Sequence, residues 1–181
     1  MALTSTIFTF DIELADVDRG VYETLSLRVP CHPSETEERL VARVLAYCLE
    51  YTEGIAFSNG LSDPDLPTIS IRDLTGTLLA WIDVGAPDAA RVHRASKAAG
   101  RVAVYAYEDP ARLLRAWSGE RIHRSEEIEL HVIDRAMLAS IVAQLKRRMQ
   151  LALMITGGQL YVTVESEVIE GAVRRQSITP P

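Results

Sequence analysis

The segment Leu66–Asp88, which reads LPTISIRDLTGTLLAWIDVGAPD, constrains the fold of this chain more than any other. Two apolar runs flank Thr75-Gly76, a pair that favours the turn of a β-hairpin. If these two residues form a two-residue loop, the strand pairing places Asp83 opposite Thr68. A carboxylate inside an apolar strand is costly to bury unless a cation, a metal ion or hydrogen bonds stabilise it. Asp83 is therefore the first candidate for a functional residue.

The overall composition narrows the function class. The 181 residues are 48 % hydrophobic and carry a net charge of −6, which argues against a strongly basic nucleic-acid binder but allows a local basic groove. Cys31 and Cys48 have neither metal-binding spacing nor a disulfide framework. The segment MALTSTIFTF lacks the basic region of a signal peptide, and no apolar run is long enough to span a bilayer. We expect a cytoplasmic bacterial protein, monomeric or weakly dimeric, with no membrane partner.

The first half of the chain predicts a hairpin followed by a helix. Period-two alternation indicates strands at 4–14 and 21–29. In the next segment, Ser34 is the expected N-cap and Glu37 completes a capping box. Apolar residues at helical spacing then predict a buried stripe made by Leu40, Val41, Val44, Leu45 and Cys48.

The remaining elements alternate between strands and helices after a loop at 58–67. Asp88 and Asp134 are expected to cap two of the helices, and Gly157-Gly158 predicts a second tight hairpin. No linker or repeat divides the sequence, so we expect one domain over residues 1–181 with a mixed α/β fold. The expected strands are 68–74, 77–85, 102–107, 128–133, 150–155 and 159–164, and the expected helices are 89–99, 110–117 and 134–147.

Four segments together resemble the YaeQ family of bacterial proteins: HPSETEERLVARVLAYCL, GLSDPD, LTGTLLAWIDVGAPD and RRMQLALMITGGQLYV. The resemblance covers nearly the whole chain. It implies a fold similar to the PD-(D/E)XK nuclease superfamily, with a mixed sheet in a restriction-endonuclease-like core flanked by N- and C-terminal β-hairpins.

Nucleases of this superfamily bind Mg²⁺ through three acidic positions, and their lysine holds the attacking water. The first position is a Glu on the first core helix, for which the candidates are Glu35 and Glu38. The second is an Asp early in the second strand, where this chain has Thr68. The third is an acidic-x-Lys triplet on the third strand, where Asp83 is followed by Gly85 in place of the lysine. The resemblance therefore implies a degenerate nuclease site.

Other residues could replace the missing ones. Asp65 could supply the second carboxylate if its loop folds inward. Arg91, Arg94 and Lys97 lie at three-residue spacing on the next helix, and any of them could contact the scissile phosphate. The metal site would then contain Glu35, Asp83 and Asp65, with Glu38 as an assisting residue and Ser34, Thr68 and Gln150 lining the cleft.

Each candidate also has a purely structural interpretation. Asp83 could form a buried ion pair with Arg91 or Arg94, and Glu35 could simply stabilise the helix dipole. The charged face of the second helix is commonly just solvated. Gln150 lies in an apolar strand, where it either binds backbone groups or lines a cleft.

Two functions follow from these readings. The first is a Mg²⁺-dependent nuclease acting on DNA or RNA. The alternative is a non-catalytic module that keeps the fold and binds nucleic acid or another protein. The basic run Lys146–Arg148 could steer phosphate toward a cleft, or it could serve only as a solvated helix end. P-loop, dinucleotide-binding, zincin and serine-hydrolase motifs are absent from the sequence.

Overall fold

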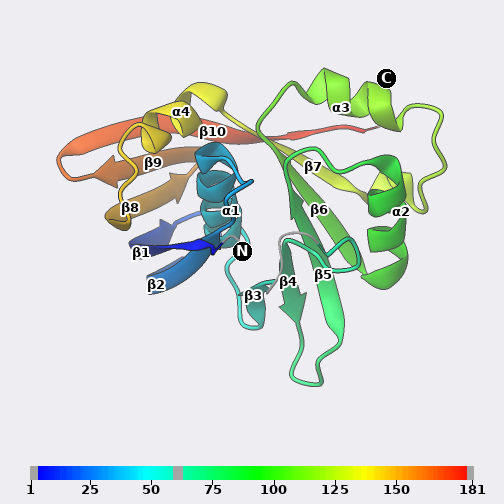
Figure 1. Ribbon diagram of the computed structural model, residues 1–181, viewed down its shortest axis with the longest axis horizontal. Coiled ribbons are helices and arrows are strands. Elements are labelled where there is room, and N and C mark those ends of the chain that lie inside the picture. Colours follow the sequence, from blue (N-terminus) through cyan, green and yellow to red (C-terminus); the bar gives the residue numbers. More distant parts are fainter. Residues whose placement is uncertain (1–3, 59–62, 179–181) are drawn as a thin grey trace. The chain divides into compact units, whose positions relative to one another are not determined.

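The computed structural model describes residues 4–58 and 63–178, over which the chain forms a mixed α/β fold (Figure 1). Residues 59–62 of the predicted loop lie outside the described residues. The chain divides into two compact units, one made of Met1–Ala42 with Ile133–Val173 and the other of Arg43–Val132 with Arg174–Pro181. Helix α1 (Glu37–Leu49) begins in the first unit and ends in the second. The assignment of a single domain stays a prediction.

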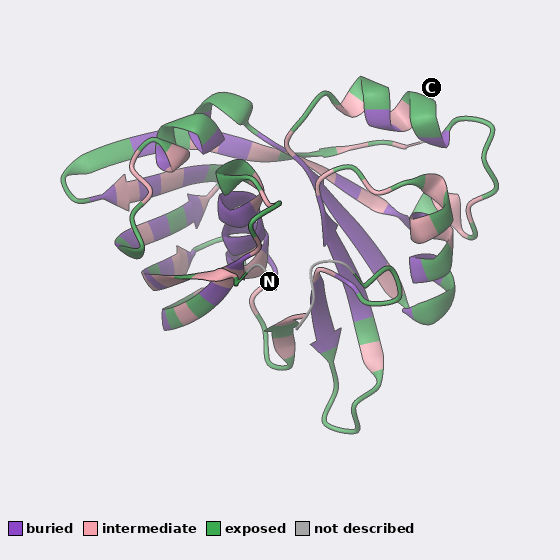
Figure 2. Cartoon of the chain, viewed as in Figure 1, coloured by how far each residue is buried: buried purple, intermediate pink, exposed green. Residues whose placement is uncertain are grey.

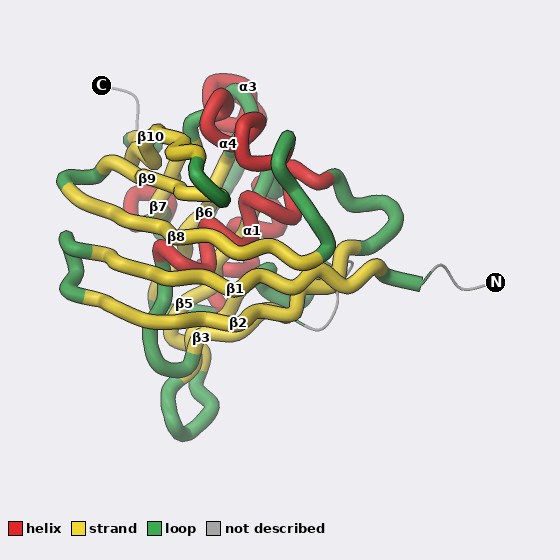
Figure 3. The backbone as a smooth tube through the Cα atoms, turned by 90° about the vertical axis from the view of Figure 1, so that its left-hand side faces the viewer, coloured by secondary structure: helices red, strands yellow, loops and turns green. Residues whose placement is uncertain are grey.

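The first unit contains a mixed sheet whose strands lie side by side in the order β2-β1-β8-β9-β10 (Figure 3). Only β1 and β8 pair in parallel, while the other neighbours are antiparallel. The predicted hairpins at both ends of the chain are confirmed. The strands are β1 (Thr6–Asp16), β2 (Val21–Cys31), β8 (Arg148–Thr156), β9 (Gln159–Val164) and β10 (Glu167–Gln176), the last of which ends in the second unit.

The turn between β8 and β9 has glycine at both central positions. Gly157 and Gly158 have φ angles of 58° and 74°, the left-handed values that a type I′ hairpin requires. Their amides donate to the two carboxylate oxygens of Asp18 at 2.7 and 2.9 Å. These backbone hydrogen bonds lower the pKa of Asp18, and they join the two hairpin turns of the unit.

The alternation along β1 sorts its side chains onto the two faces of this sheet. Phe10, Ile12 and Leu14 are buried, whereas Asp11 and Glu13 project from the other face, and Figure 2 shows the resulting stripes. Helix α4 (Arg135–Val142) packs against the buried face. Its Met137 approaches Gly171 so closely that an added Cβ at position 171 would lie 2.6 Å from the Met137 side chain.

The second unit contains a five-stranded sheet in the order β3-β4-β5-β6-β7. The pairs β3–β4 and β4–β5 are antiparallel, and β5, β6 and β7 are parallel. The strands are β3 (Ile55–Phe57), β4 (Ile69–Arg72), β5 (Leu78–Val84), β6 (Arg101–Ala106) and β7 (Glu129–Ile133), and the other elements are α2 (Ala89–Ala98), α3 (Pro110–Trp117) and a 3₁₀ turn at Ser125–Glu127.

The predicted pairing of β4 with β5 is confirmed, although the predicted two-residue loop is wrong. Ile69 faces Ile82, as expected. The turn is longer, because the amide of Asp73 donates to the carbonyl of Thr77 at 3.1 Å. A bulge before Arg72 shifts the register by one residue and restores the predicted pairing.

Helices α2 and α3 bury one face of the second sheet. Asp88 caps α2 as predicted, since its side chain accepts from the amide of Arg91 at 2.7 Å. The cluster on this face contains Trp81, Val92, Ala95, Val102, Val104, Leu113, Trp117 and Leu130. The predicted stripe of α1 is also confirmed, because all five of its residues are buried.

The sequence prediction missed two strands and overextended one helix. β3 has only three residues, too few for a periodicity signal, and β10 mixes polar and apolar residues without strict alternation. Helix α4 ends at Val142 rather than at 147, because the amides of Gln144 and Leu145 donate three residues back to Ile141 and Val142. The chain then enters β8 at Arg148, two residues earlier than predicted.

Candidate functional site

Asp83 lies on β5 with only 2 % of its surface exposed, and donors surround its carboxylate. Oδ2 accepts from Nε of Arg91 at 2.7 Å and from Nε1 of Trp81 at 3.0 Å. Oδ1 accepts from Nη2 of Arg91 at 2.8 Å and from the amide and hydroxyl of Thr68, both at 3.2 Å. The predicted Thr68–Asp83 neighbours therefore meet, and the structural interpretation of Asp83 as the partner of Arg91 is observed.

Arg91 is held in place on its other side as well. Nη2 donates to the carbonyl of Leu66 at 2.8 Å, and Nη1 donates to that of Pro64 at 3.1 Å. The guanidinium also lies 5.5 Å from the centre of the Trp81 ring, within the range of a cation–π interaction. The ion pair thus links β5 and α2 to the segment that precedes β4.

Arg94, Lys97 and Asp65 lie nearer to solvent. Nη1 of Arg94 donates to the carbonyl of Pro64 at 2.9 Å and lies 3.4 Å from the carboxylate of Asp65. The side chain of Asp65 is 74 % exposed, and Lys97 is exposed in the last turn of α2. The α2 cations therefore have three different surroundings, and only Arg91 reaches Asp83.

A second charged cluster lies on the opposite face of the same sheet. Arg101 donates to both oxygens of Glu50 at 2.6 and 2.9 Å and to both oxygens of Glu129 at 3.1 and 2.7 Å. The hydroxyl of Tyr105 donates to Glu50 at 2.6 Å, and the Tyr105 and His131 rings stack 4.7 Å apart. His131 Nε2 lies 3.2 Å from Glu129.

This arrangement determines how the cluster titrates. Burial raises the pKa of Glu50, but the hydrogen bonds and charge of Arg101 together with Tyr105 outweigh it, so the net shift is downward. Hydrogen bonds from Arg101 lower the pKa of Glu129 to about 2. Burial raises the pKa of Tyr105 well above its ordinary value. Both carboxylates are therefore ionised at neutral pH, and both are paired with the single guanidinium of Arg101.

The predicted cap of the first helix is wrong. Helix α1 begins at Glu37, and its N-cap is Thr36, whose hydroxyl accepts from the amide of Arg39 at 3.2 Å. Ser34 lies two residues earlier, where its hydroxyl is 2.6 Å from Nδ1 of His32. The capping box of Ser34 and Glu37 therefore does not form, because the chain turns before the helix starts.

The two candidate glutamates of this region differ in their surroundings. Glu35 precedes α1, its side chain is only 3 % exposed, and it forms an ion pair with Nη1 of Arg39 at 2.8 Å. Glu38 is exposed on the first turn. Both belong to the first unit, whereas Asp83 and Asp65 belong to the second.

Metal-binding geometry is missing from the part of the chain that the structure describes. No three histidine, cysteine or acidic side chains among these residues are grouped so that they could hold a metal ion. Within the second unit, the carboxylates of Asp83 and Asp65 each face a different arginine. The predicted Mg²⁺ site thus gains no support from the positions of its residues.

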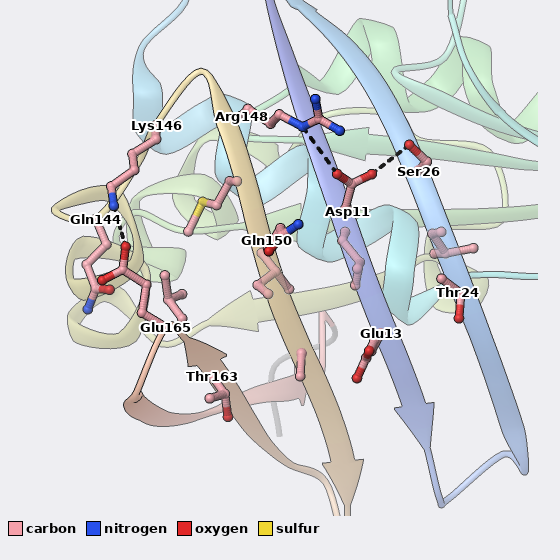
Figure 4. A pocket seen from close by; sticks show the side chains of 16 residues that line it. Asp11, Glu13, Thr24, Ser26, Gln144, Lys146, Arg148, Gln150, Thr163 and Glu165 are labelled. Atoms are coloured by element: carbon pink, nitrogen blue, oxygen red, sulfur yellow. Dashed lines mark hydrogen bonds and ion pairs between the residues drawn. The ribbon is translucent and has the colours of Figure 1, made fainter.

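The first unit contains a groove whose lining includes Gln150 and two residues of the predicted basic run, Lys146 and Arg148. It has a volume of about 780 Å³ and lies on the face of the sheet that carries Asp11 and Glu13 (Figure 4). Gln150 projects into it from β8, exposed rather than buried as expected. The other polar lining residues are Thr24, Ser26, Gln144, Thr163 and Glu165.

The charges of the groove are largely paired with one another. Nε of Arg148 lies 3.6 Å from the carboxylate of Asp11, which also accepts from the hydroxyl of Ser26 at 2.7 Å. Lys146 pairs with Glu165, as the dashed lines in Figure 4 show. Two of the three cations in the predicted basic run are therefore matched by carboxylates. The alternation of apolar and polar residues along β1 and β2 was the sequence signal that could have revealed the polar face of this sheet.

Comparisons with known proteins identify the family. The family model described as YaeQ protein matches residues 1–173. This chain belongs to the YaeQ family. It is 30 % identical to the YaeQ protein of Escherichia coli K12 over 173 residues, which cover 94 % of both chains. It is 31 % identical to that of Salmonella typhi over 168 residues, which cover 90 % of this chain and 91 % of the other.

Solved structures of the YaeQ family share the fold of this chain. The crystal structure of the YaeQ protein from Pseudomonas syringae superposes with a TM-score of 0.83 at 34 % identity, covering 98 % of this chain and 97 % of the other. The protein from Xanthomonas axonopodis pv. citri gives 0.82 at 27 % identity, with 96 % and 99 % covered. In the described residues, none of the helices has the length and apolar character needed to cross a membrane.

Proposed function

We propose that this member of the YaeQ family is a non-catalytic binding protein on a nuclease-like fold, and that it binds a protein partner in the groove of the first unit. The observation that carries this proposal is the state of Asp83. Both of its carboxylate oxygens accept from the guanidinium of Arg91, and three further donors complete its surroundings. The residue that the sequence assigned to metal binding has a structural role instead.

The order of elements supports a nuclease-like core in the second unit. The superfamily motif places its Asp early in the second strand and its acidic-x-Lys triplet on the third. β3 precedes β4 and β5, so Thr68 stands directly before the second strand and Asp83 near the end of the third. This order supports the proposal of a nuclease-like core in which two of the three motif side-chain types are replaced.

Mg²⁺ binding would require Asp83 to give up its present partners. Mg²⁺ needs nearly octahedral oxygen ligands at 2.0–2.1 Å, whereas Nε and Nη2 of Arg91 occupy one oxygen each. The guanidinium would also repel a dication so close to it. Gly85 offers no side chain in place of the motif lysine, and the neutral Thr68, whose hydroxyl donates to Asp83, replaces a charged carboxylate of the kind that Mg²⁺ prefers.

The charges of the groove favour a protein over a nucleic acid. A polyanion would compete with Asp11 for Arg148 and with Glu165 for Lys146, and it would meet the carboxylate of Glu13. Nucleic-acid affinity depends on cations that are free to neutralise phosphates. A peptide segment can instead use the exposed hydroxyl, amide and backbone groups of such a surface.

A cleavage and binding panel tests this function. Labelled single- and double-stranded DNA and RNA are incubated with the wild-type protein in Mg²⁺ or Mn²⁺, and their binding is followed by fluorescence anisotropy at 50 and 200 mM salt. We expect neither cleavage nor tight binding. Cleavage that is lost in Asp83→Asn and kept in Glu108→Gln, which changes an exposed carboxylate of the same unit, would refute the non-catalytic assignment. Tight binding with a steep salt dependence would refute the choice of a protein partner.

A further inference from the structure

The open face of the sheet in the first unit carries a row of apolar side chains that crosses four strands. The strand pairing places Tyr22 of β2 beside Ala15 of β1, Ala15 beside Met154 of β8, and Met154 beside Tyr161 of β9. Tyr22 is 62 % exposed and Met154 43 % exposed, while Ala15 and Tyr161 are half-buried. Water therefore covers a continuous apolar strip across the strands that Figure 3 shows side by side.

Two carboxylates stand at the edges of this row. Glu13 projects from β1 on the same face, two residues before Ala15, and it also lines the groove. Glu170 of β10 pairs with Tyr161 and extends the row by one strand. Both glutamates are exposed, and within the described part of the chain neither carboxylate has a hydrogen bond or an ion pair. The nearby Asp11 and Glu165, by contrast, are paired with Arg148 and Lys146.

We infer that this row and its two glutamates recognise a basic protein segment, in which two lysine or arginine residues four positions apart flank an apolar residue. The inference rests on the proposed protein-binding function and names the chemistry of the partner. The carboxylates of Glu13 and Glu170 bind the two cations, and the apolar residue packs on Met154 and Tyr161. Charge complementarity selects this occupant, because the unpaired groups beside the strip are both anionic.

The spacing of the glutamates fits such a segment. Neighbouring strands lie about 4.8 Å apart and alternate residues about 6.8 Å apart, so the Cα atoms of Glu13 and Glu170 are about 16 Å from each other. Residues four apart in an extended chain span about 13.5 Å, and flexible cationic side chains cover the difference. Tyr22 and Tyr161 are also aromatic, and the face of a tyrosine ring attracts a guanidinium or ammonium group within about 6 Å.

The probe for this inference is the peptide Ac-Arg-Ala-Leu-Ala-Arg-NH₂, compared with the same peptide carrying citrulline at both arginines. Citrulline keeps the shape and hydrogen-bonding capacity of the side chain but removes its charge. Each peptide is titrated into the full-length ¹⁵N-labelled protein. We expect the arginine peptide to shift the amide signals of Ala15, Tyr22, Met154 and Tyr161, and to bind about tenfold more tightly than the citrulline peptide, since each exposed ion pair contributes up to a few-fold.

Three single variants test where the arginine peptide binds. Glu13→Gln and Glu170→Gln should each weaken binding of the arginine peptide by about threefold. Glu23→Gln should leave it unchanged, because Glu23 is exposed on β2 but pairs with the buried Leu14 and so projects from the opposite face. All three substitutions replace a surface carboxylate by an amide of the same shape, so they are matched in their effect on folding.

Several results would overturn the inference. Equal affinity for the two peptides, no shifts in the row at millimolar peptide, or equal weakening by Glu23→Gln would each exclude charge recognition at this strip. Concentration-dependent self-association that buries the same row would assign it to a second copy of the chain. These outcomes leave the proposed protein-binding function standing, whereas cleavage or tight binding of nucleic acid in the panel above refutes that function independently of the peptides.

Discussion

Replacing Asp83 by Asn should cost this protein about 3–5 kcal/mol of unfolding free energy, the usual range when one partner of a buried ion pair is removed. Asn has nearly the same shape as Asp, so no cavity forms. Its NH₂ group, however, must face either Arg91 and Trp81 on one side or Arg91 and Thr68 on the other. Either orientation sets donors against donors and leaves the guanidinium without its anion.

Urea denaturation followed by tryptophan fluorescence measures this loss. Trp81 and Trp117, the two tryptophans of the chain, both lie in the second unit and report on the region that the ion pair holds together. Asp65→Asn is the matched control. It removes a carboxylate from the same region, but that carboxylate is largely exposed, so we expect a loss below about 1 kcal/mol.

Comparing the unfolding free energies of Asp83→Asn and Asp65→Asn tests whether Asp83 belongs to a buried ion pair. A loss below about 1 kcal/mol for Asp83→Asn would place its carboxylate outside any buried pair. A gain of stability for the wild-type protein in millimolar Mg²⁺ that disappears in Asp83→Asn would assign the carboxylate to a metal site. Either result would refute the assignment of Asp83 to a buried ion pair with Arg91.

Three further predictions concern other parts of the fold. Arg101 lowers the pKa of Glu129 from an ordinary value of 4.5 to about 2. The stabilising contribution of Glu129 is therefore complete above pH 4.5 and is lost as the pH falls toward 2. Glu129→Gln should flatten the decline in unfolding free energy over this interval, and an unchanged slope would contradict the assignment. Gly171→Ala should cost about 1–3 kcal/mol because its Cβ would overlap Met137, so an unchanged melting temperature would be inconsistent with this packing. Asp88→Ala should cost about 1 kcal/mol through loss of the α2 cap, seen in the same urea titration.

Much of the fold could be predicted from the sequence, because many of its elements depend only on residues that are close together in the chain. The alternation along β1 and β2, the Gly157-Gly158 turn and the Asp88 cap each depend on neighbouring residues, and each is confirmed. The pairing of Asp83 with Thr68 was predicted from an incorrect loop, and a bulge near Arg72 compensated for the error. The pattern of apolar positions in the sequence indicates neither the bulge nor the longer turn.

The candidate site was harder to predict because its chemistry depends on tertiary neighbours. Sequence spacing placed Arg91 on the same helix face as Arg94 and Lys97, yet only Arg91 approaches Asp83. The choice between a metal ligand and an ion pair depends on which of these side chains points inward, and periodicity does not encode that direction. The groove was missed because its lining combines four strands and two turns from distant parts of the sequence.

We propose that Asp83 is the structural partner of Arg91 and not a metal ligand. Anomalous scattering from a crystal of the wild-type protein soaked in Mn²⁺ tests this claim most directly. We predict no manganese peak within coordinating distance of the Asp83 carboxylate, with both hydrogen bonds from Arg91 still in place. A peak about 2.2 Å from an Asp83 oxygen, with the guanidinium displaced, would contradict the claim.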